Sequence, residues 1–271
     1  MAALVPAQRC LDVLELLAER PDGMALPGVA DTLKIPKSAT HRILSLLSAR
    51  GYTAQHEDTG RYRLTMRLTA MGFRILSETN LSEVCQPVLD RLAARSGELA
   101  RLAVVDRNGL TWVAKAQGAT GGLRYDPDMG REVVLHATAT GKAWLATLPV
   151  DEALALVAAR GFAVPERFGP RAVKTLPALR REIEATRRRG YGVAVEEGEP
   201  GTAALAAVVR RSAAVDAPVV GTISIAGPLA RLTAGHRERF AKDVLAAARE
   251  LSALWPVRDF GGRVVPARAA E

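Results

Sequence analysis

One segment of the chain gathers side chains that could contact DNA. Residues 37–50 have the apolar periodicity of a helix, and the first turns carry cationic, hydroxyl and imidazole groups. The side chains expected on the exposed face are Lys37, Ser38, Thr40, His41 and Arg42. Such groups suit base edges and phosphates, because the N-terminal end of a recognition helix enters the major groove first. An ordinary solvated helix face has a similar composition, so this segment alone leaves both interpretations open.

A basic hairpin follows this helix. Residues 52–56 and 61–64 form two short alternating runs around the sequence EDTG, which is typical of a hairpin. Arg61 and Arg63 lie on the second run. Between positions 34 and 74 the chain has eight lysines and arginines but only two acidic residues. This local excess of positive charge favours contact with phosphates.

The surrounding elements would position these side chains as a winged helix-turn-helix. A helix near residues 7–20 forms the floor, and a helix near 27–34 packs through Val29, Ala30 and Leu33. The recognition helix is expected to end at Gly51, a left-handed cap. Its buried stripe is predicted to consist of Ile43, Leu44, Leu46 and Leu47.

The rest of the chain predicts a second, α+β domain. An amphipathic helix is expected at 68–78 as a linker, followed by a helix at 81–95 that Gly97 closes. Strands are predicted at 99–106, 110–117, 192–196, 202–210 and 219–226, and helices at 137–148, 151–160, 176–189 and 234–255. Asp151, Thr175 and Thr233 are the expected N-caps of helices in this domain.

A glycine-lysine pair in this domain invites comparison with a phosphate-binding loop. Gly141 and Lys142 have the right order, but His136 replaces the first glycine of that motif and Ala143 replaces the Ser or Thr that follows the lysine. Neither the backbone cradle nor the magnesium ligand would then exist. The sequence therefore argues against nucleotide hydrolysis.

No other pattern predicts catalysis, a metal or a cofactor. The four histidines lack the spacing of metal ligands, and no nucleophile elbow is present. Glu196 and Glu197 are adjacent on a predicted strand, so their side chains should point to opposite faces rather than act as an acid and base pair. We expect no catalytic residues, no metal site and no cofactor.

Length and charge agree with a two-domain protein that has acidic partners. The chain has 271 residues, a formal net charge of +8 and a pI near 10.0. A second arginine cluster at residues 180–189 is interpreted as a solvated helix face. Cys10 and Cys85 are expected to be buried free thiols. Without a membrane-spanning run or signal peptide, we expect a cytoplasmic protein with no membrane partner.

Several sequence segments resemble the IclR family of bacterial transcriptional regulators. SATHRILSLLSARGY, GRYRL and LTMRLTAMGFRIL look like its DNA-binding half, and residues 135–148, 187–209 and 220–233 resemble its effector-binding domain. The resemblance covers roughly residues 6–255. It implies a winged helix-turn-helix at 1–66, a linker helix at 67–80, a GAF/profilin-like α+β effector-binding domain at 81–256 and a flexible tail at 257–271.

The same resemblance implies an effector pocket. Its expected residues are Met129, Leu135, Ala139, Thr140, Ala194, Glu196, Thr202, Ala204, Ser224 and Ala226. Family members that bind small oxo-acids can have polar or sulfur-bearing side chains where this chain has alanine at 194, 204 and 226. These smaller walls favour a bulkier, aromatic organic acid.

We therefore expect a ligand-responsive regulator that binds a palindromic operator in double-stranded DNA and controls a catabolic operon. The resemblance implies a homodimer that pairs into a homotetramer. Two alternatives stay open from the residues: an enzyme acting on a small carboxylate, and a DNA-binding protein without a ligand. The enzyme would need a nucleophile or an acid and base pair. The sequence leaves repression and activation equally open.

Overall fold

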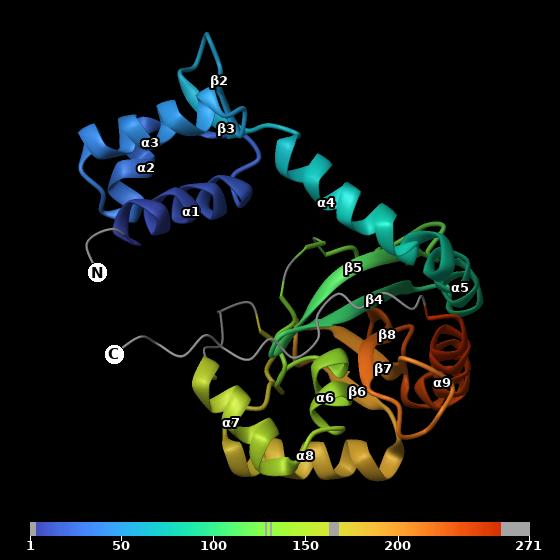
Figure 1. Cartoon of the computed structure of the whole chain (residues 1–271). Coiled ribbons are helices and arrows are strands. Elements are labelled where there is room, and N and C mark those ends of the chain that lie inside the picture. The colour runs from blue at the N-terminus through green and yellow to red at the C-terminus, as the bar shows by residue number, and fades with distance from the viewer. Residues whose placement is uncertain (1–3, 128, 131, 163–167, 256–271) are drawn as a thin grey trace. The chain divides into compact units, whose positions relative to one another are not determined.

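The structure is a computed structural model, and it describes residues 4–127, 129–130, 132–162 and 168–255. The chain divides into two compact units, Met1–Glu78 and Thr79–Glu271 (Figure 1). Each unit has its own hydrophobic core. Among the described helices, none has both the length and the apolar composition that crossing a bilayer requires.

The first unit is a winged helix-turn-helix followed by one more helix, as the sequence predicted. Its elements are α1 (Leu4–Ala18), β1 (Met24–Ala25), α2 (Leu26–Leu33), α3 (Lys37–Ala49), β2 (Thr53–Gln55), β3 (Arg61–Leu64) and α4 (Arg67–Thr79). The three strands pair antiparallel in the order β1-β3-β2. Leu17 of α1, Val29 of α2 and Leu44 of α3 meet Tyr62 of the wing in one core, so the wing is fixed to the helices.

The recognition helix departs from the prediction at Leu46. Its side chain is 53% exposed, although we predicted that it would be buried. Thr40, Ile43, Leu44 and Leu47, at positions i, i+3, i+4 and i+7, already form the inward face. Leu46 therefore falls outside that face. The predicted cap is confirmed, since Gly51 has a φ of +73° directly after the helix.

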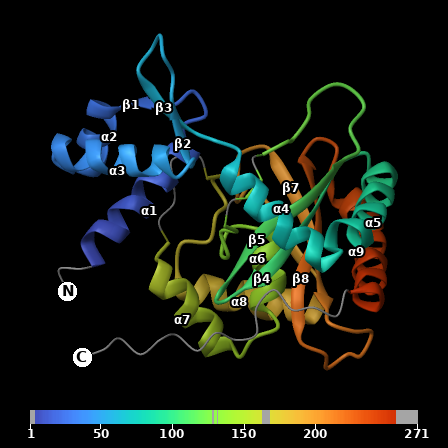
Figure 2. The same cartoon turned by 45° about the horizontal axis from the view of Figure 1, so that its top comes forward.

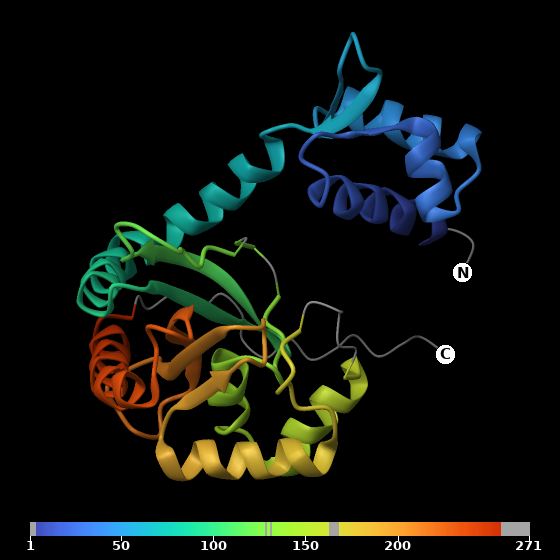
Figure 3. The ribbon, with the colours of Figure 1, turned by 180° about the vertical axis from the view of Figure 1, so that it is seen from behind.

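The second unit is built on a five-stranded antiparallel sheet in the order β5-β4-β8-β7-β6. The strands are β4 (Leu99–Asp106), β5 (Gly109–Gln117), β6 (Gly192–Val195), β7 (Thr202–Arg210) and β8 (Val219–Pro228). The helices are α5 (Leu81–Ser96), α6 (Ala139–Leu145), α7 (Val150–Arg160), α8 (Leu176–Arg189) and α9 (Ala234–Leu254). Figures 2 and 3 show α5 and α9 together on one face of the sheet, while α6 covers the other face and α8 packs behind α6.

Two helices of the second unit, α7 and α6, begin at other residues than the sequence predicted. Asp151 is not an N-cap, because Pro149 occupies that position and the Asp151 carboxylate instead accepts a hydrogen bond from Arg180 at 2.9 Å. Thr175 caps α8 as expected. The helix predicted at 137–148 spans only Ala139–Leu145, since the Thr138 hydroxyl accepts the Gly141 N–H at 3.0 Å and caps the helix there.

Glycine allows α6 to lie directly against the sheet. A Cβ added at Gly192 in β6 would lie 2.1 Å from the Ala139 carbonyl oxygen at the start of α6. Any side chain at position 192 would push the helix away. The close approach places the first residues of α6 beside the strands that carry the predicted pocket residues.

Candidate functional site

The exposed face of α3 carries four of the five side chains predicted for it. Lys37, Ser38, His41 and Arg42 are all exposed. Ser45 extends the same face, since it lies four residues after His41 and is also exposed. We did not single out Ser45 from the sequence, although its helical spacing was enough to find it.

Thr40 is a correction to the predicted DNA-binding set. Its side chain is fully buried, and its hydroxyl donates to the Pro36 carbonyl oxygen at 3.2 Å. The hydroxyl is therefore satisfied inside the protein and does not face solvent. Thr40 closes the turn before the recognition helix rather than standing on its exposed face.

The wing presents its two predicted arginines on one side. Arg61 and Arg63 are exposed on β3, and Tyr62 between them is buried in the core. Because side chains alternate along a strand, both guanidinium groups project away from the core. Within the described part of the chain, no carboxylate pairs with Arg42, Arg61 or Arg63. Their charges are available to an outside anion.

A cavity of about 40 Å³ lies in the second unit between the start of α6 and the sheet. Seven of the ten predicted effector residues line it: Ala139, Thr140, Ala194, Thr202, Ala204, Ser224 and Ala226. Ala194, Ala204 and Ala226 stand opposite one another on β6, β7 and β8. The three sequence segments therefore meet in one place.

Three predicted effector residues do not line this cavity. Leu135 is buried in the core beside Trp144, and Met129 packs against that same core. The Glu196 carboxylate lies 3.6 Å from the Arg171 guanidinium instead. The resemblance placed these three residues near the pocket in sequence, but tertiary packing separates them from it.

Four larger side chains that we did not predict line the cavity: Arg101, Trp112, Tyr125 and Glu197. Arg101 is only 8% exposed, and its guanidinium carbon lies 3.7 Å from the centre of the Trp112 ring. The Arg101 Nε–H has no hydrogen-bond partner in the described structure. A lone arginine in a predicted strand gave no sign that it would turn inward, because arginine is usually exposed.

The Arg101 guanidinium is a charged group held inside the domain. Burial lowers its pKa, while Tyr125, Glu199 and Asp126 oppose that shift. Burial also raises the pKa of the Tyr125 hydroxyl, which lies beside both Arg101 and Glu199. Since arginine does not lose its proton in proteins, the cavity contains a fixed cation.

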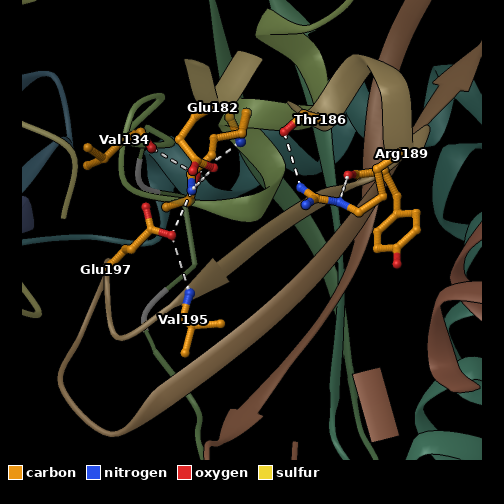
Figure 4. A network of polar contacts seen from close by, with 10 residues as sticks. Val134, Glu182, Thr186, Arg189, Val195 and Glu197 are labelled. Atoms are coloured by element: carbon orange, nitrogen blue, oxygen red, sulfur yellow. Dashed lines mark hydrogen bonds and ion pairs between the residues drawn. The ribbon is translucent and has the colours of Figure 1, made fainter. Parts of the chain in front are cut away.

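Next to the cavity-lining Glu197, the fully buried Lys142 lies between two carboxylates, those of Glu197 and Glu182, which Figure 4 labels. Its Nζ donates to Glu197 Oε1 at 2.6 Å and to Glu182 Oε2 at 3.2 Å. Glu197 Oε1 also accepts the Val195 N–H at 3.3 Å, whereas Glu197 Oε2 is buried and finds no partner among the described residues. Burial raises the pKa of Glu197, and Lys142 opposes that shift.

A larger cavity of about 890 Å³ lies at the other end of α6. Two of the four arginines that line it are engaged with backbone carbonyls, since Arg187 donates to Ala146 and Leu148, and Arg210 donates to Ala217. A third, Arg107, lies 3.8 Å from the Asp106 carboxylate. We therefore regard the smaller cavity, with its unpartnered polar atoms, as the candidate ligand site. Among the residues that the structure describes, no three His, Cys, Asp or Glu side chains form a metal-binding group.

The comparisons with known proteins agree with this architecture. The family model for the bacterial transcriptional regulator IclR C-terminal domain matches residues 73–253, and the IclR helix-turn-helix domain matches residues 6–57. The HTH-type transcriptional regulator BhcR of Paracoccus denitrificans is 30% identical over 94% of this chain and 89% of its own length. The Escherichia coli regulator XynR is 27% identical over 93% of this chain and 98% of its own length.

Solved structures show the same fold at lower identity. An IclR transcriptional regulator from Alicyclobacillus acidocaldarius superposes with a TM-score of 0.76 at 21% identity, over 91% of this chain and 97% of that one. An IclR homologue from Microbacterium hydrocarbonoxydans, solved in complex with 4-hydroxybenzoate, superposes with a TM-score of 0.72 at 24% identity and the same coverage.

Proposed function

Because this chain belongs to the IclR family of bacterial transcriptional regulators, we propose that its first unit binds a palindromic operator and its second unit senses a small organic acid. The DNA-binding part of the proposal rests on the exposed cations of α3 and β3. Among the residues that the structure describes, no carboxylate pairs with Arg42, Arg61 or Arg63. In this proposal α3 enters the major groove, and the wing contacts phosphates or the minor groove.

We propose that the protein binds as a homodimer, with one recognition helix for each half-site, and that dimers pair into a tetramer. A palindromic operator mirrors a twofold axis in the protein. The helix α4 supports self-association, since Met71 and Ile75, four residues apart on one face of the helix, are both exposed. Such a patch marks an interaction surface.

The DNA-binding proposal is tested with Arg42→Ala and Arg61→Ala on DNA selected from a random pool. If Arg42 contacts a base, its loss should cost about 1 to 3 kcal/mol at one base position. If Arg61 contacts a phosphate, its loss should lower the affinity for every DNA sequence alike. The slope of log affinity against log salt concentration should then become shallower by about 1. Arg181→Ala is the matched control, because Arg181 is an exposed arginine on α8. Unchanged affinity in both variants would refute the docking.

We propose that the effector binds in the cavity beside α6. Arg101 supplies a buried cation for a carboxylate, and Thr140 and Ser224 line the same space. The three alanines favoured an aromatic acid, but Arg101 and Trp112 also line this space and leave only about 40 Å³. A cavity that holds benzene has about 150 Å³. Even a short acid, which has about as many heavy atoms as benzene, therefore requires outward movement of lining side chains such as Tyr125, and an aromatic acid requires more.

A thermal-shift screen against short and aromatic acids tests this second part. A ligand at about 100 times its dissociation constant should stabilise the protein by about 2.7 kcal/mol. An enzyme would instead consume the acid, which product analysis of the same samples detects. A DNA-binding protein without a ligand would show no shift with any acid. We place the regulator in the cytoplasm, where its DNA target lies.

A further inference from the structure

Two buried side chains line the effector cavity, and each has one polar atom for which the described residues supply no hydrogen-bond partner. These atoms are Arg101 Nε and Glu197 Oε2. Both residues are only 8% exposed. More than about nine in ten buried polar groups in folded proteins have a partner, so two exceptions that line one small cavity call for a physical explanation. A ligand that satisfies both atoms supplies one.

The Arg101 side chain is held in a fixed orientation. Its guanidinium carbon lies over the Trp112 ring, 3.7 Å from the ring centre, and 5.8 Å from the centre of the Tyr125 ring, so two aromatic side chains hold it in place. A planar cation with an unpaired N–H favours a carboxylate, because hydrogen bonds between two charged groups are the strongest in proteins. One end of the ligand is therefore an acid.

Glu197 requires a hydrogen-bond donor on the part of the ligand that lies beside it. Its Oε1 already accepts hydrogen bonds from Lys142 Nζ and from the Val195 N–H. The ionised carboxylate can then accept one more hydrogen bond, through Oε2. Lys142 lies closer to Glu197 than to Glu182, whose side chain is 40% exposed, so solvent screens Glu182 while Lys142 mainly compensates the buried Glu197. An ammonium group on the ligand would then bring an uncompensated charge into a buried site. A neutral donor such as a hydroxyl fits better.

We propose that the cavity recognises a hydroxycarboxylic acid, whose carboxylate binds Arg101 Nε–H and whose hydroxyl donates to Glu197 Oε2. This inference rests on the proposed effector cavity and specifies its ligand class. Such a site discriminates against a keto acid, which offers only a hydrogen-bond acceptor to Glu197. It also discriminates against an unsubstituted acid, which offers no polar group there.

Three acids of equal carbon number test the proposal: lactate, pyruvate and propionate. Binding to the full chain is measured by calorimetry at about pH 8. A hydrogen bond to a charged group corresponds to at least about a tenfold difference in affinity, so lactate should bind at least tenfold more tightly than the other two. The pair 4-hydroxybenzoate and benzoate repeats the comparison at aromatic size.

The variant Glu197→Gln should abolish the preference for lactate over pyruvate, because the hydroxyl and the keto oxygen can both accept from the new amide. Lys142 Nζ and the Val195 N–H are both donors, so the glutamine amide oxygen must take the place of Oε1. The amide NH₂ then faces the cavity and offers a donor where the native side chain offers an acceptor. Glu182→Gln is the matched control: it removes the other carboxylate that binds Lys142, but Glu182 does not line the cavity. It should retain the preference for lactate.

Equal affinity for the hydroxylated and unsubstituted acids would overturn the proposal, and so would a preference for lactate that survives Glu197→Gln. Absence of binding by every acid would overturn it as well. Operator binding is measured separately with the α3 and wing variants. Failure of hydroxyl recognition is therefore distinguishable from failure of the proposed DNA-binding function.

Discussion

Replacing Lys142 by methionine should destabilise the second unit by about 2 to 3 kcal/mol at pH 7. The thioether fills most of the volume of the lysine stem, so the main loss is the cation 2.6 Å from Glu197. Leaving a buried carboxylate unpaired costs about 3 to 5 kcal/mol. Glu197 can avoid part of that cost by taking up a proton, which at pH 7 costs at most about 3.7 kcal/mol for a glutamate with the ordinary pKa near 4.3. Burial raises the pKa of Glu197 and makes protonation cheaper.

The same reasoning gives the variant a defined pH dependence. Without Lys142, the folded pKa of Glu197 rises further above its unfolded value. A carboxyl group with a raised folded pKa stabilises the fold at low pH, and this contribution is lost as the pH rises through the folded pKa. The penalty of Lys142→Met should therefore fall to about 1 kcal/mol at pH 5, where protonation costs at most about that much.

Urea unfolding followed by tryptophan fluorescence measures this effect. All three tryptophans, at positions 112, 144 and 255, lie in the second unit, so the signal reports that unit alone. The double variant Lys142→Met/Glu197→Gln should recover most of the loss, because it removes the unpaired charge. Glu182→Gln should cost under about 1 kcal/mol, since Glu182 is partly solvated. A loss from Lys142→Met that is equal at pH 5 and pH 7, or that the second substitution does not relieve, would refute the reasoning.

Thr40→Val should cost about 1 kcal/mol of stability, because one buried hydrogen bond is lost, and should leave operator affinity unchanged; weaker DNA binding by the folded variant would show that Thr40 acts in recognition. Gly192→Ala should lower the melting temperature and weaken acid binding, since its Cβ would meet the Ala139 carbonyl at 2.1 Å, whereas Gly235→Ala, with nothing within 4 Å, should be tolerated. Equal effects of the two substitutions would contradict the close packing of α6. The preference for lactate over propionate should fade as the pH falls from 8 to 5, since burial raises the pKa of Glu197 and a protonated Oε2 no longer accepts. Lys142 opposes that shift and Glu182 adds to it; a preference that grows at pH 5, measured by calorimetry, would argue against an ionised acceptor.

The sequence was most informative where structure depends on neighbouring residues. Apolar periodicity and turn chemistry located α2, α3 and the wing to within a few residues, and Gly51 ends the recognition helix as predicted. The exposed arginines of the wing followed from strand alternation alone. Such features depend on local geometry, which a single sequence encodes directly.

Residues placed by tertiary contacts were harder to predict. Thr40 has the composition of a recognition residue, but its hydroxyl bonds the Pro36 carbonyl and turns inward. Arg101 has no sequence mark of burial, because its environment comes from Trp112 on the neighbouring strand and Tyr125 beyond it. We did expect the Glu196 and Glu197 side chains to diverge. The partner of Glu197, however, lies 55 positions earlier in the chain.

The central claim is that an acid bound beside Arg101 changes the affinity of the first unit for DNA. The most direct measurement is the operator affinity of the full chain with and without an acid that binds, in the native protein and in a folded Arg101→Met variant. Coupling between the two sites should change the native affinity by about 5- to 150-fold. The variant should show no change. Equal responses of the two proteins, or an operator affinity that no bound acid alters, would contradict the account.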